Sequence, residues 1–287
     1  MSNPAWLEIS RGSAPLVVSI PHTGLDLADI EDQVVSPWLA RKDADWWIEK
    51  LYDFAGELGA TVIRTSISRT VIDVNRDPSG ASLYPGQATT SLCPTTSFDG
   101  EPLYRDGCEP EKAEIERRRS SFFDPYQQAL AGEIDRLKAA NGEVVLYDCH
   151  SIRSVIPRLF EGKLPVFNLG TNKGESAAPD LQEKVRDIIA CSGRSHVVNG
   201  RFTGGWITRS HGRPREGVHA LQMELACRGY MREPIGPVDE AAWPTPYDPE
   251  YAADLRSTLR TILEAAVSWV RQRNEASKSN QSPETSR

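Results

Sequence analysis

Short apolar runs alternate with longer segments of helical periodicity along this chain. The short runs are rich in Val, Ile and Leu, which is typical of buried β-strands. They predict strands at residues 16–20, 61–64, 70–74, 144–147, 165–169, 197–198, 206–207 and 218–225.

The segments between these runs have the spacing of amphipathic helices. A first helix is predicted to open at Ser36-Pro37-Trp38 and to end at Gly59. A second covers residues 111–140, where Asp124-Pro125 predicts a kink or a division into two helices. Others are predicted at 179–191 and from Asp248-Pro249 to Val270. Strands interleaved with helices predict an α/β protein, a three-layer α/β/α fold with a mixed, largely parallel central sheet.

Residues 77–108 break this alternation, because they are rich in Pro, Gly, Ser and Thr. We expect a long ordered loop there that acts as the lid or wall of a binding site. No change in composition marks a domain boundary, so residues 1–273 are expected to form a single domain. The polar tail, residues 274–287, is expected to be disordered.

Composition and charge narrow the class of protein. The chain is 39% hydrophobic and 25% charged, with a net charge of −7 and a pI of about 5.4, which argues against nucleic-acid binding. No apolar stretch approaches the ~20 residues of a membrane span, and the start does not resemble a signal peptide. The five Cys are scattered, without a Cys-x-x-Cys pair. We therefore expect a cytoplasmic monomer or small homo-oligomer without membrane or nucleic-acid partners.

Two of the five histidines lie where apolar strand-like runs stop. His22 follows the run at 16–20, and His150 follows the run at 144–147. Because ligands gather at the carboxyl ends of strands in open α/β sheets, the pair suggests a metal site, although either His alone is better explained as a structural residue. Asp148 faces the same side of the strand as His150, so it is expected to orient that ligand from the second shell.

A catalytic zinc site usually has three protein ligands and a fourth position for water. The third ligand is expected to be a carboxylate from Lys42-Asp43-Ala44-Asp45. Asp45 is preferred and Asp43 is the alternative ligand. Both could instead be acids that stabilise the first turn of a helix.

Glu224 lies in an apolar run and needs a reason to be there, since an unpaired buried charge is costly. It is either paired with an Arg or acts as a general base toward a metal-activated water. Strand alternation places Gln222 on the same face as Glu224 and turns His219 to the other face.

Arginines near these residues suggest a pocket for an anion in an acidic protein. Arg69 and Arg76 flank the run at 70–74, and Asn75 precedes Arg76. Guanidinium groups bind carboxylates in bidentate fashion, although surface ion pairs are the commoner fate of Arg. Further positive charge is expected from Arg153, Arg158 and Arg213.

The motifs taken together resemble one family. They are Ser19-Ile20-Pro21-His22-Thr23-Gly24, Leu51-Tyr52-Asp53-Phe54, Tyr84-Pro85-Gly86-Gln87, Leu92-Cys93-Pro94-Thr95-Thr96, Phe98-Asp99-Gly100-Glu101-Pro102-Leu103-Tyr104, Asp148-Cys149-His150-Ser151-Ile152-Arg153 and Asn168-Leu169-Gly170-Thr171-Asn172. From about residue 14 to 270, the chain resembles the N-formylglutamate amidohydrolase (deformylase) family, itself distantly similar to zinc carboxypeptidases and N-acyl-amino-acid deacylases. The resemblance implies a phosphorylase/zinc-exopeptidase-like fold and hydrolysis of N-formyl-L-glutamate to formate and L-glutamate in histidine degradation.

The resemblance also implies roles for single residues. His22 and His150 match two metal ligands, Asn75-Arg76 matches a pair that grips a substrate carboxylate, and Glu224 matches the catalytic glutamate. The carboxypeptidase pattern has a metal-binding Glu three residues after the first His, where this chain has Leu25. The third ligand is therefore expected from Asp45 or Asp43.

These observations combine into one mechanism and two alternatives. We expect one divalent ion, most simply Zn²⁺, on His22, Asp45 and His150, with Glu224 as proton carrier. Arg69, Asn75 and Arg76 are expected to bind one substrate carboxylate, and Arg153, Arg158 or Arg213 the other. The alternatives are a deacylase for another N-acyl acidic amino acid (acetyl or succinyl) and a non-catalytic binding protein for acidic metabolites.

Overall fold

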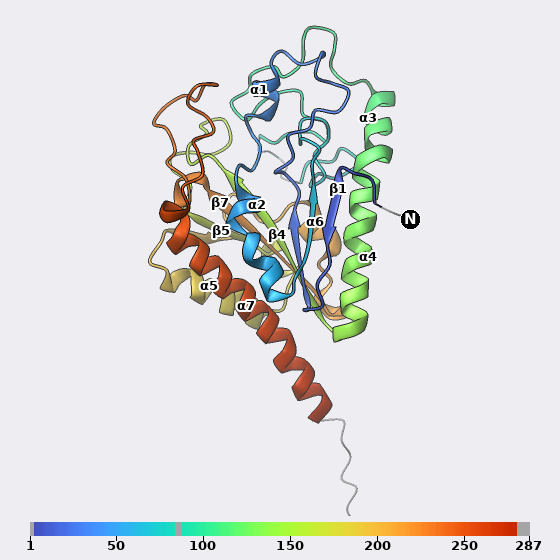
Figure 1. Ribbon diagram of the computed structural model, residues 1–287, viewed down its shortest axis with the longest axis vertical. Coiled ribbons are helices and arrows are strands. Elements are labelled where there is room, and N and C mark those ends of the chain that lie inside the picture. Colours follow the sequence, from blue (N-terminus) through green and yellow to red (C-terminus); the bar gives the residue numbers. More distant parts are fainter. Residues whose placement is uncertain (1–2, 84–85, 87, 280–287) are drawn as a thin grey trace, which may run out of the picture.

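A seven-stranded sheet forms the centre of the molecule, for which a computed structural model describes residues 3–83, 86 and 88–279 (Figure 1). The spatial order of the strands is β1-β3-β2-β4-β7-β5-β6. Their bounds are β1 (Leu7–Ser10), β2 (Leu16–Ile20), β3 (Thr61–Thr65), β4 (Val144–Ile152), β5 (Phe167–Gly170), β6 (His196–Val198) and β7 (Val218–Ala226).

The four central strands β3, β2, β4 and β7 are parallel to one another. β1 pairs antiparallel to β3, β5 pairs antiparallel to β7, and β6 is parallel to β5. The expected mixed, largely parallel sheet is therefore confirmed. Every residue of β2, β4 and β7 is buried, which explains why these strands read as continuous apolar runs in the sequence.

Helices cover both faces of the sheet, as the three-layer prediction requires (Figure 1). Side chains of α2, α5 and α7 pack on one face, against Val18 and Tyr147, and those of α4 and α6 pack on the other, against Val17 and Leu146. The α-helices are α1 (Pro37–Arg41), α2 (Ile48–Leu51), α3 (Lys112–Arg118), α4 (Asp124–Asn141), α5 (Pro179–Cys191), α6 (Trp206–His211) and α7 (Pro249–Ser279). The short helical turns are η1 (Asp53–Leu58), η3 (Asn172–Gly174), η4 (Pro214–Glu216) and η5 (Cys227–Gly229).

A π-helical segment, η2 (Arg119–Phe123), joins α3 to α4 at the predicted interruption. Pro125 has no N–H to donate to the preceding turn, and a π-bulge accommodates this loss without ending the helix. Within the part of the chain that the structure describes, no helix is long and apolar enough to cross a membrane.

The predicted first helix is wrong in its continuity. Between Pro37 and Gly59 the chain forms α1, α2 and the 3₁₀ turn η1 instead of one helix, and Trp47 has φ +66° at the start of α2. The predicted stop is correct, because Gly59 adopts φ +73° at the end of η1. The break between α1 and α2 is important for the site, as described below.

Two predicted strands are also wrong. Residues 70–74 form buried turns, and Val71 and Ile72 pack into different apolar clusters instead of alternating across a pleat. Trp206 and Ile207 begin α6. An apolar pair of this length does not distinguish helix from strand.

The last helix extends beyond its predicted end at Val270. α7 continues to Ser279, so residues 274–279 of the polar tail are helical, and residues 280–287 lie outside the described residues. The described parts of 77–108 contain no regular helix or strand, as expected for a long loop, and Leu92, Phe98 and Leu103 anchor it in the interior. Of the motif at 84–87, only Gly86 is among the described residues.

Candidate functional site

The candidate site lies at the carboxyl edge of the parallel strands. His22 follows the end of β2 by two residues, and His150 lies near the end of β4. His150 is the direct register partner of Glu224 on β7. The sheet thus places side chains from three distant parts of the sequence at one edge, as the strand-end argument predicts.

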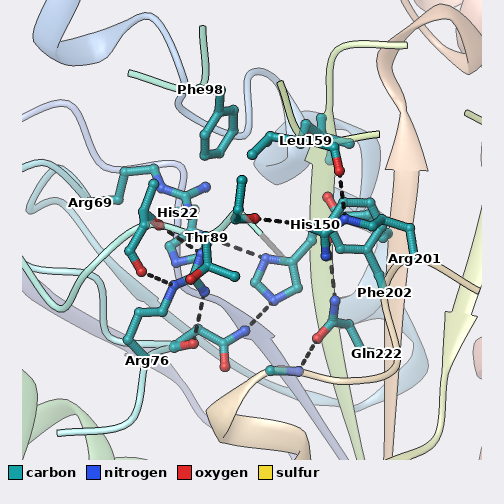
Figure 2. Close-up of a pocket in the computed structure, with 17 residues that line it drawn as sticks. His22, Arg69, Arg76, Thr89, Phe98, His150, Leu159, Arg201, Phe202 and Gln222 are labelled. Atoms are coloured by element: carbon teal, nitrogen blue, oxygen red, sulfur yellow. Dashed lines mark hydrogen bonds between the residues drawn. The ribbon is translucent and has the colours of Figure 1, made fainter. Parts of the chain in front are cut away.

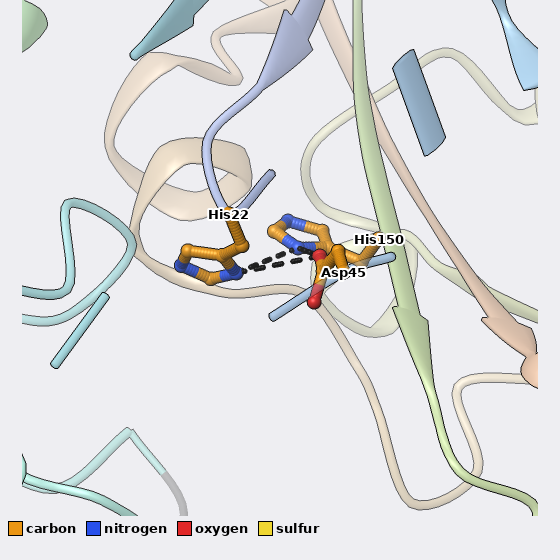
Figure 3. Close-up of side chains that lie close together, drawn as sticks. All are labelled: His22, Asp45 and His150. Atoms are coloured by element: carbon orange, nitrogen blue, oxygen red, sulfur yellow. Dashed lines mark hydrogen bonds and ion pairs between the residues drawn. The ribbon is translucent and has the colours of Figure 1, made fainter. Parts of the chain in front are cut away.

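His22, Asp45 and His150 form a buried group whose ligand atoms converge (Figure 3). The Nδ1 atoms of the two histidines are 3.1 Å apart. Asp45 Oδ2 lies 3.1 Å from Nδ1 of His150 and 3.5 Å from Nδ1 of His22. All three residues are at most 3% exposed. Two imidazoles and a carboxylate in this arrangement could hold a metal ion.

The break between α1 and α2 delivers Asp45 to the histidines. The backbone N–H of Asp45 donates to the carbonyl of His22 at 2.9 Å, which ties this turn to the end of β2. The left-handed backbone of Trp47 then restarts the helix. Such a conformation is unfavourable for a non-glycine residue and persists where surrounding contacts require it.

Asp43 is directed elsewhere. Its Oδ2 accepts the backbone N–H of Phe98 at 2.6 Å, and its Oδ1 lies 3.3 Å from Arg153. Burial raises the pKa of Asp43, despite the opposing charge of Arg153. Of the two carboxylates proposed as the third ligand, the structure brings Asp45 and not Asp43 to the histidines.

Each histidine is held from behind by a second carboxylate. Nε2 of His22 lies 2.7 Å from Oδ1 of Asp73, and Nε2 of His150 lies 2.8 Å from Oδ2 of Asp148. When these Nε2–H groups donate to the carboxylates, both Nδ1 lone pairs face the space beside Asp45. This is the outer-shell arrangement that orients metal-binding histidines. The contact of Asp148 was expected, whereas Asp73 was not singled out.

A buried hydrogen-bond network fixes Asp148 in turn. Ser19 donates to Oδ1 of Asp148 at 2.8 Å, and the hydroxyl of Tyr126 lies 3.1 Å from Ser19 Oγ. The amide nitrogen of Asn75 lies 3.0 Å from Oδ2 of Asp148 and 2.8 Å from Nε2 of His150. The Asn75 oxygen accepts the backbone N–H of Ile207, at the start of α6. Both ends of the Asn75 amide are therefore occupied by the protein.

The charges of the group are strongly perturbed. Burial raises the pKa of Asp45, but the charge of His22 and the hydrogen bond with His150 outweigh burial and hold it below the ordinary value. Burial lowers the pKa of His150, but Asp148 and Asp45 outweigh that effect and raise it. Asp45 Oδ1 is buried and has no hydrogen-bond partner among the described residues, and a guanidinium nitrogen of Arg69 is 3.6 Å away. A cation between the three side chains would compensate this excess of acceptors.

Glu224 lines the same cavity as the two histidines. Burial, reinforced by the charge of Asp45, raises its pKa to about 7 against the opposing charges of His150 and Arg69. Gln222 donates to Oε2 of Glu224 at 3.3 Å and accepts the backbone N–H of Gly205 at 2.6 Å, so it restrains the carboxylate. A carboxylate with a pKa near 7 is suited to general acid–base chemistry at neutral pH.

The cavity around these residues encloses about 570 Å³, including its open mouth (Figure 2). Arg69 and Arg76 lie beside His22, whereas Arg201 lies beyond His150 in this view. Phe98, Leu159 and Phe202 supply apolar wall. Arg69 donates to Asp73 Oδ2 at 2.7 Å and stacks on Phe98, so it stands directly behind the His22 side of the group.

Three predicted arginines do not line this cavity. Arg153 is bound by Asp99 at 2.7 Å and by Asp43. Arg158 Nη1 lies near the carbonyls of Ser97 and Phe98. Arg213 lies away from the cavity, because its backbone pairs with Val218 at the other end of β7, about 20 Å of strand away from Glu224.

Arg201 and Asp73 are the residues that sequence reasoning missed. Asp73 had a usable signal, because it is an acid in the middle of an apolar run, the same signal that identified Glu224. The signal for Arg201 was weak: it is an arginine next to Phe202, in a short segment between Gly200 and Gly204. His219 is on the opposite face of β7 as predicted, where it contacts Trp269 and Ala178.

Fold and site together define an α/β protein with a buried His–Asp–His group, able to hold a metal ion, at the carboxyl edge of its parallel strands. The profile of the N-formylglutamate amidohydrolase family matches residues 14–231, and the chain belongs to this family. The resemblance inferred from the sequence motifs is thus confirmed.

Two relatives agree with this membership, and one solved structure shares the fold. An N-formylglutamate deformylase from Pseudomonas aeruginosa is 45% identical over 269 residues, 93% of this chain and 98% of that protein. One from Pseudomonas putida is 44% identical over 265 residues, 92% of this chain and 96% of that protein. The crystal structure of an N-formylglutamate amidohydrolase from Ralstonia eutropha JMP134 has the same fold, with a TM-score of 0.75 at 22% identity, over 94% of this chain and 99% of that one.

Proposed function

We propose that this protein is a metal-dependent amidohydrolase that cleaves N-formyl-L-glutamate to formate and L-glutamate. The observation that carries the proposal is the convergence of His22, Asp45 and His150 beside one cavity. Both histidines line that cavity, together with Glu224, Arg69, Arg76 and Arg201. The names of the relatives at 45% and 44% identity support the choice of substrate.

The donor set supports zinc as the ion. Three ligand atoms about 2.1 Å from a tetrahedral zinc would lie roughly 3.4 Å from one another. The corresponding distances here are 3.1, 3.1 and 3.5 Å. Two neutral imidazoles and one carboxylate leave a fourth position open, which is typical of catalytic rather than structural zinc.

When bound, the ion supplies Lewis-acid polarisation of the formyl carbonyl and lowers the pKa of water toward ~7. Glu224 accepts the proton of the attacking water, which its raised pKa of about 7 favours. The same carboxyl group then returns the proton to the departing amine of glutamate. Asp73 and Asp148 keep the two imidazole rings in the required tautomer.

One carboxylate of the substrate is proposed to bind on the His22 side of the cavity, at Arg69 and Arg76. Asn75 was expected to share this role, but its amide already contacts Asp148, His150 and the backbone of Ile207. We therefore propose that Asn75 supports Asp148. The substrate carboxylate is then bound by the guanidinium groups of Arg69 and Arg76, whose planar geometry matches a carboxylate.

Elemental analysis and formate release test the proposal together. The purified protein is expected to contain one metal ion and to release formate from N-formyl-L-glutamate faster than it deacylates N-acetyl- or N-succinyl-L-glutamate. His22→Ala and His150→Ala should both lose the ion. Full metal content in both variants would contradict the ligand assignment, and a preference for the acetyl or succinyl substrate would contradict the formyl specificity.

We also propose a cytoplasmic location. All five cysteines are free thiols, which is typical of a reducing compartment.

A further inference from the structure

We infer that Arg201 is the receptor for the γ-carboxylate of the substrate and sets the preference for an acidic side chain. This inference rests on the proposed function, because it assigns one end of the same substrate. It replaces Arg153, Arg158 and Arg213, which lie outside the cavity.

Arg201 is built into the cavity wall. Its Nε donates to the carbonyl of Leu159 at 2.8 Å, and its Nη2 donates to the carbonyl of Ala88 at 2.8 Å. Its guanidinium also stacks 5.2 Å from the ring of Phe202, another residue of the wall. These contacts hold the guanidinium in one orientation, so less side-chain entropy is lost when a carboxylate binds.

The distribution of charge assigns the two ends of the substrate. Arg69 and Arg76 are tied to the metal-binding group, because both lie near Asp73, which contacts His22. Arg201 is anchored instead to Leu159 and Ala88, on the far side of His150 (Figure 2). In N-formylglutamate the α-carboxyl carbon is three bonds from the formyl carbon and the γ-carboxyl carbon is five. The nearer arginines therefore suit the α-carboxylate, and Arg201 suits the γ-carboxylate.

The spacing of the arginines agrees with this assignment. Arg76 donates to the carbonyl of Thr90, and Arg201 donates to that of Ala88. Two residues of chain span at most about 7 Å, so the two anchoring oxygens are no farther apart than roughly that distance. The carboxyl carbons of a glutamyl group are joined by four C–C bonds of about 1.5 Å, roughly 5 Å end to end. The separation of the two anchoring oxygens is therefore of the same size as a glutamyl group.

The test compares substrates that differ only at the γ-position. kcat/KM is measured for N-formyl-L-glutamate and N-formyl-L-glutamine with the wild type, Arg201→Gln and Arg201→Lys. Loss of a hydrogen bond to a charged group lowers the wild-type preference for the glutamate substrate by about 10- to 100-fold in Arg201→Gln. Arg201→Lys, which keeps the charge but not the planar fork, should restore part of that preference. Arg213→Gln is the matched control, an arginine at the other end of β7, and should keep the wild-type preference.

Binding of the products separates this inference from the proposed reaction. Calorimetric titration with L-glutamate and L-glutamine is expected to show the same loss of preference in Arg201→Gln, whatever the turnover. Equal losses on both substrates, an unchanged preference, or a wild type that does not distinguish glutamate from glutamine would overturn the role of Arg201. Failure of the wild type to release formate, with the binding preference intact, would instead refute the proposed reaction alone. Thermal melts identify any variant that fails to fold.

Discussion

Replacement of Asp148 by Asn tests the metal-binding group without touching any of its three ligands. Asp148 Oδ2 lies 2.8 Å from Nε2 of His150, and Oδ1 accepts the hydroxyl of Ser19. An asparagine that keeps the Ser19 contact presents its NH₂ group to His150. The Nε2–H group of His150 would lose its carboxylate acceptor, and the tautomer with the proton on Nδ1 would be favoured, because its bare Nε2 can accept from the new NH₂ group. That proton would occupy the lone pair needed for the ion.

The expected magnitude follows from outer-shell carboxylates at other metal sites. Loss of such a partner weakens metal binding by about 10- to 100-fold, which corresponds to roughly 1.4–2.7 kcal/mol. The effect on folding should be smaller than for Asp73→Asn, because Asp73 also neutralises the buried charge of Arg69. Within the described part of the chain, Asp148 has no arginine partner among its hydrogen bonds.

The assay is a zinc titration in competition with a chromogenic chelator. Asp43→Asn is the matched control. Asp43 is also a largely buried acid, two residues before Asp45, but it contacts Phe98 and Arg153 instead of the histidines. It should bind zinc within about twofold of wild type, well short of the tenfold expected for an outer-shell partner. Wild-type affinity in Asp148→Asn, or equal losses in both variants, would refute the reasoning.

The remaining predictions concern proton transfer and pH. Glu224→Gln should keep the metal and lose about 10²- to 10⁴-fold in kcat; near-normal turnover would remove Glu224 from the mechanism. In the wild type, kcat/KM should fall as pH falls through about 7, because Glu224 is then protonated; a profile flat from pH 8 to 6 would contradict this. Burial and the charge of Arg213 lower the pKa of His211 to about 4. The buried neutral ring contributes its full stabilisation to the fold above the unfolded pKa of about 6.5. The free energy of unfolding therefore falls as the pH drops from there toward 4, by about 2 kcal/mol at pH 5. Urea unfolding at pH 7.5 and 5 should show that loss in the wild type and a smaller one in His211→Asn; equal losses would exclude His211 as the cause.

The sequence predicted the centre of the fold well because parallel strands are buried on both faces. β2, β4 and β7 therefore appear as uninterrupted apolar runs, and the polar residues at their ends stand out. His22, His150 and Glu224 were found in this way. The same reasoning applied to residues 70–74 was wrong about the strand, but it would have identified Asp73 as a buried acid with a purpose.

The rest of the site depends on packing that sequence spacing does not encode. The break between α1 and α2 decides that Asp45, and not Asp43, faces the histidines. Which arginines line the cavity depends on which loops fold over it. Arg201 is one of them, because Leu159, Ala88 and Phe202 hold its guanidinium there. Sequence spacing also does not show that the backbone of Arg213 pairs with Val218, at the end of β7 far from Glu224.

The separation of the two histidines along the chain has a consequence for assembly. They are 128 residues apart in sequence and 3.1 Å apart in space, so an unfolded chain rarely holds them together. An ion that binds here behaves as a reversible cross-link of the native sheet, and its affinity adds to conformational stability. At a free concentration one hundred times its dissociation constant, that gain is about 2.7 kcal/mol. Chelation should therefore lower the melting temperature as well as abolish turnover.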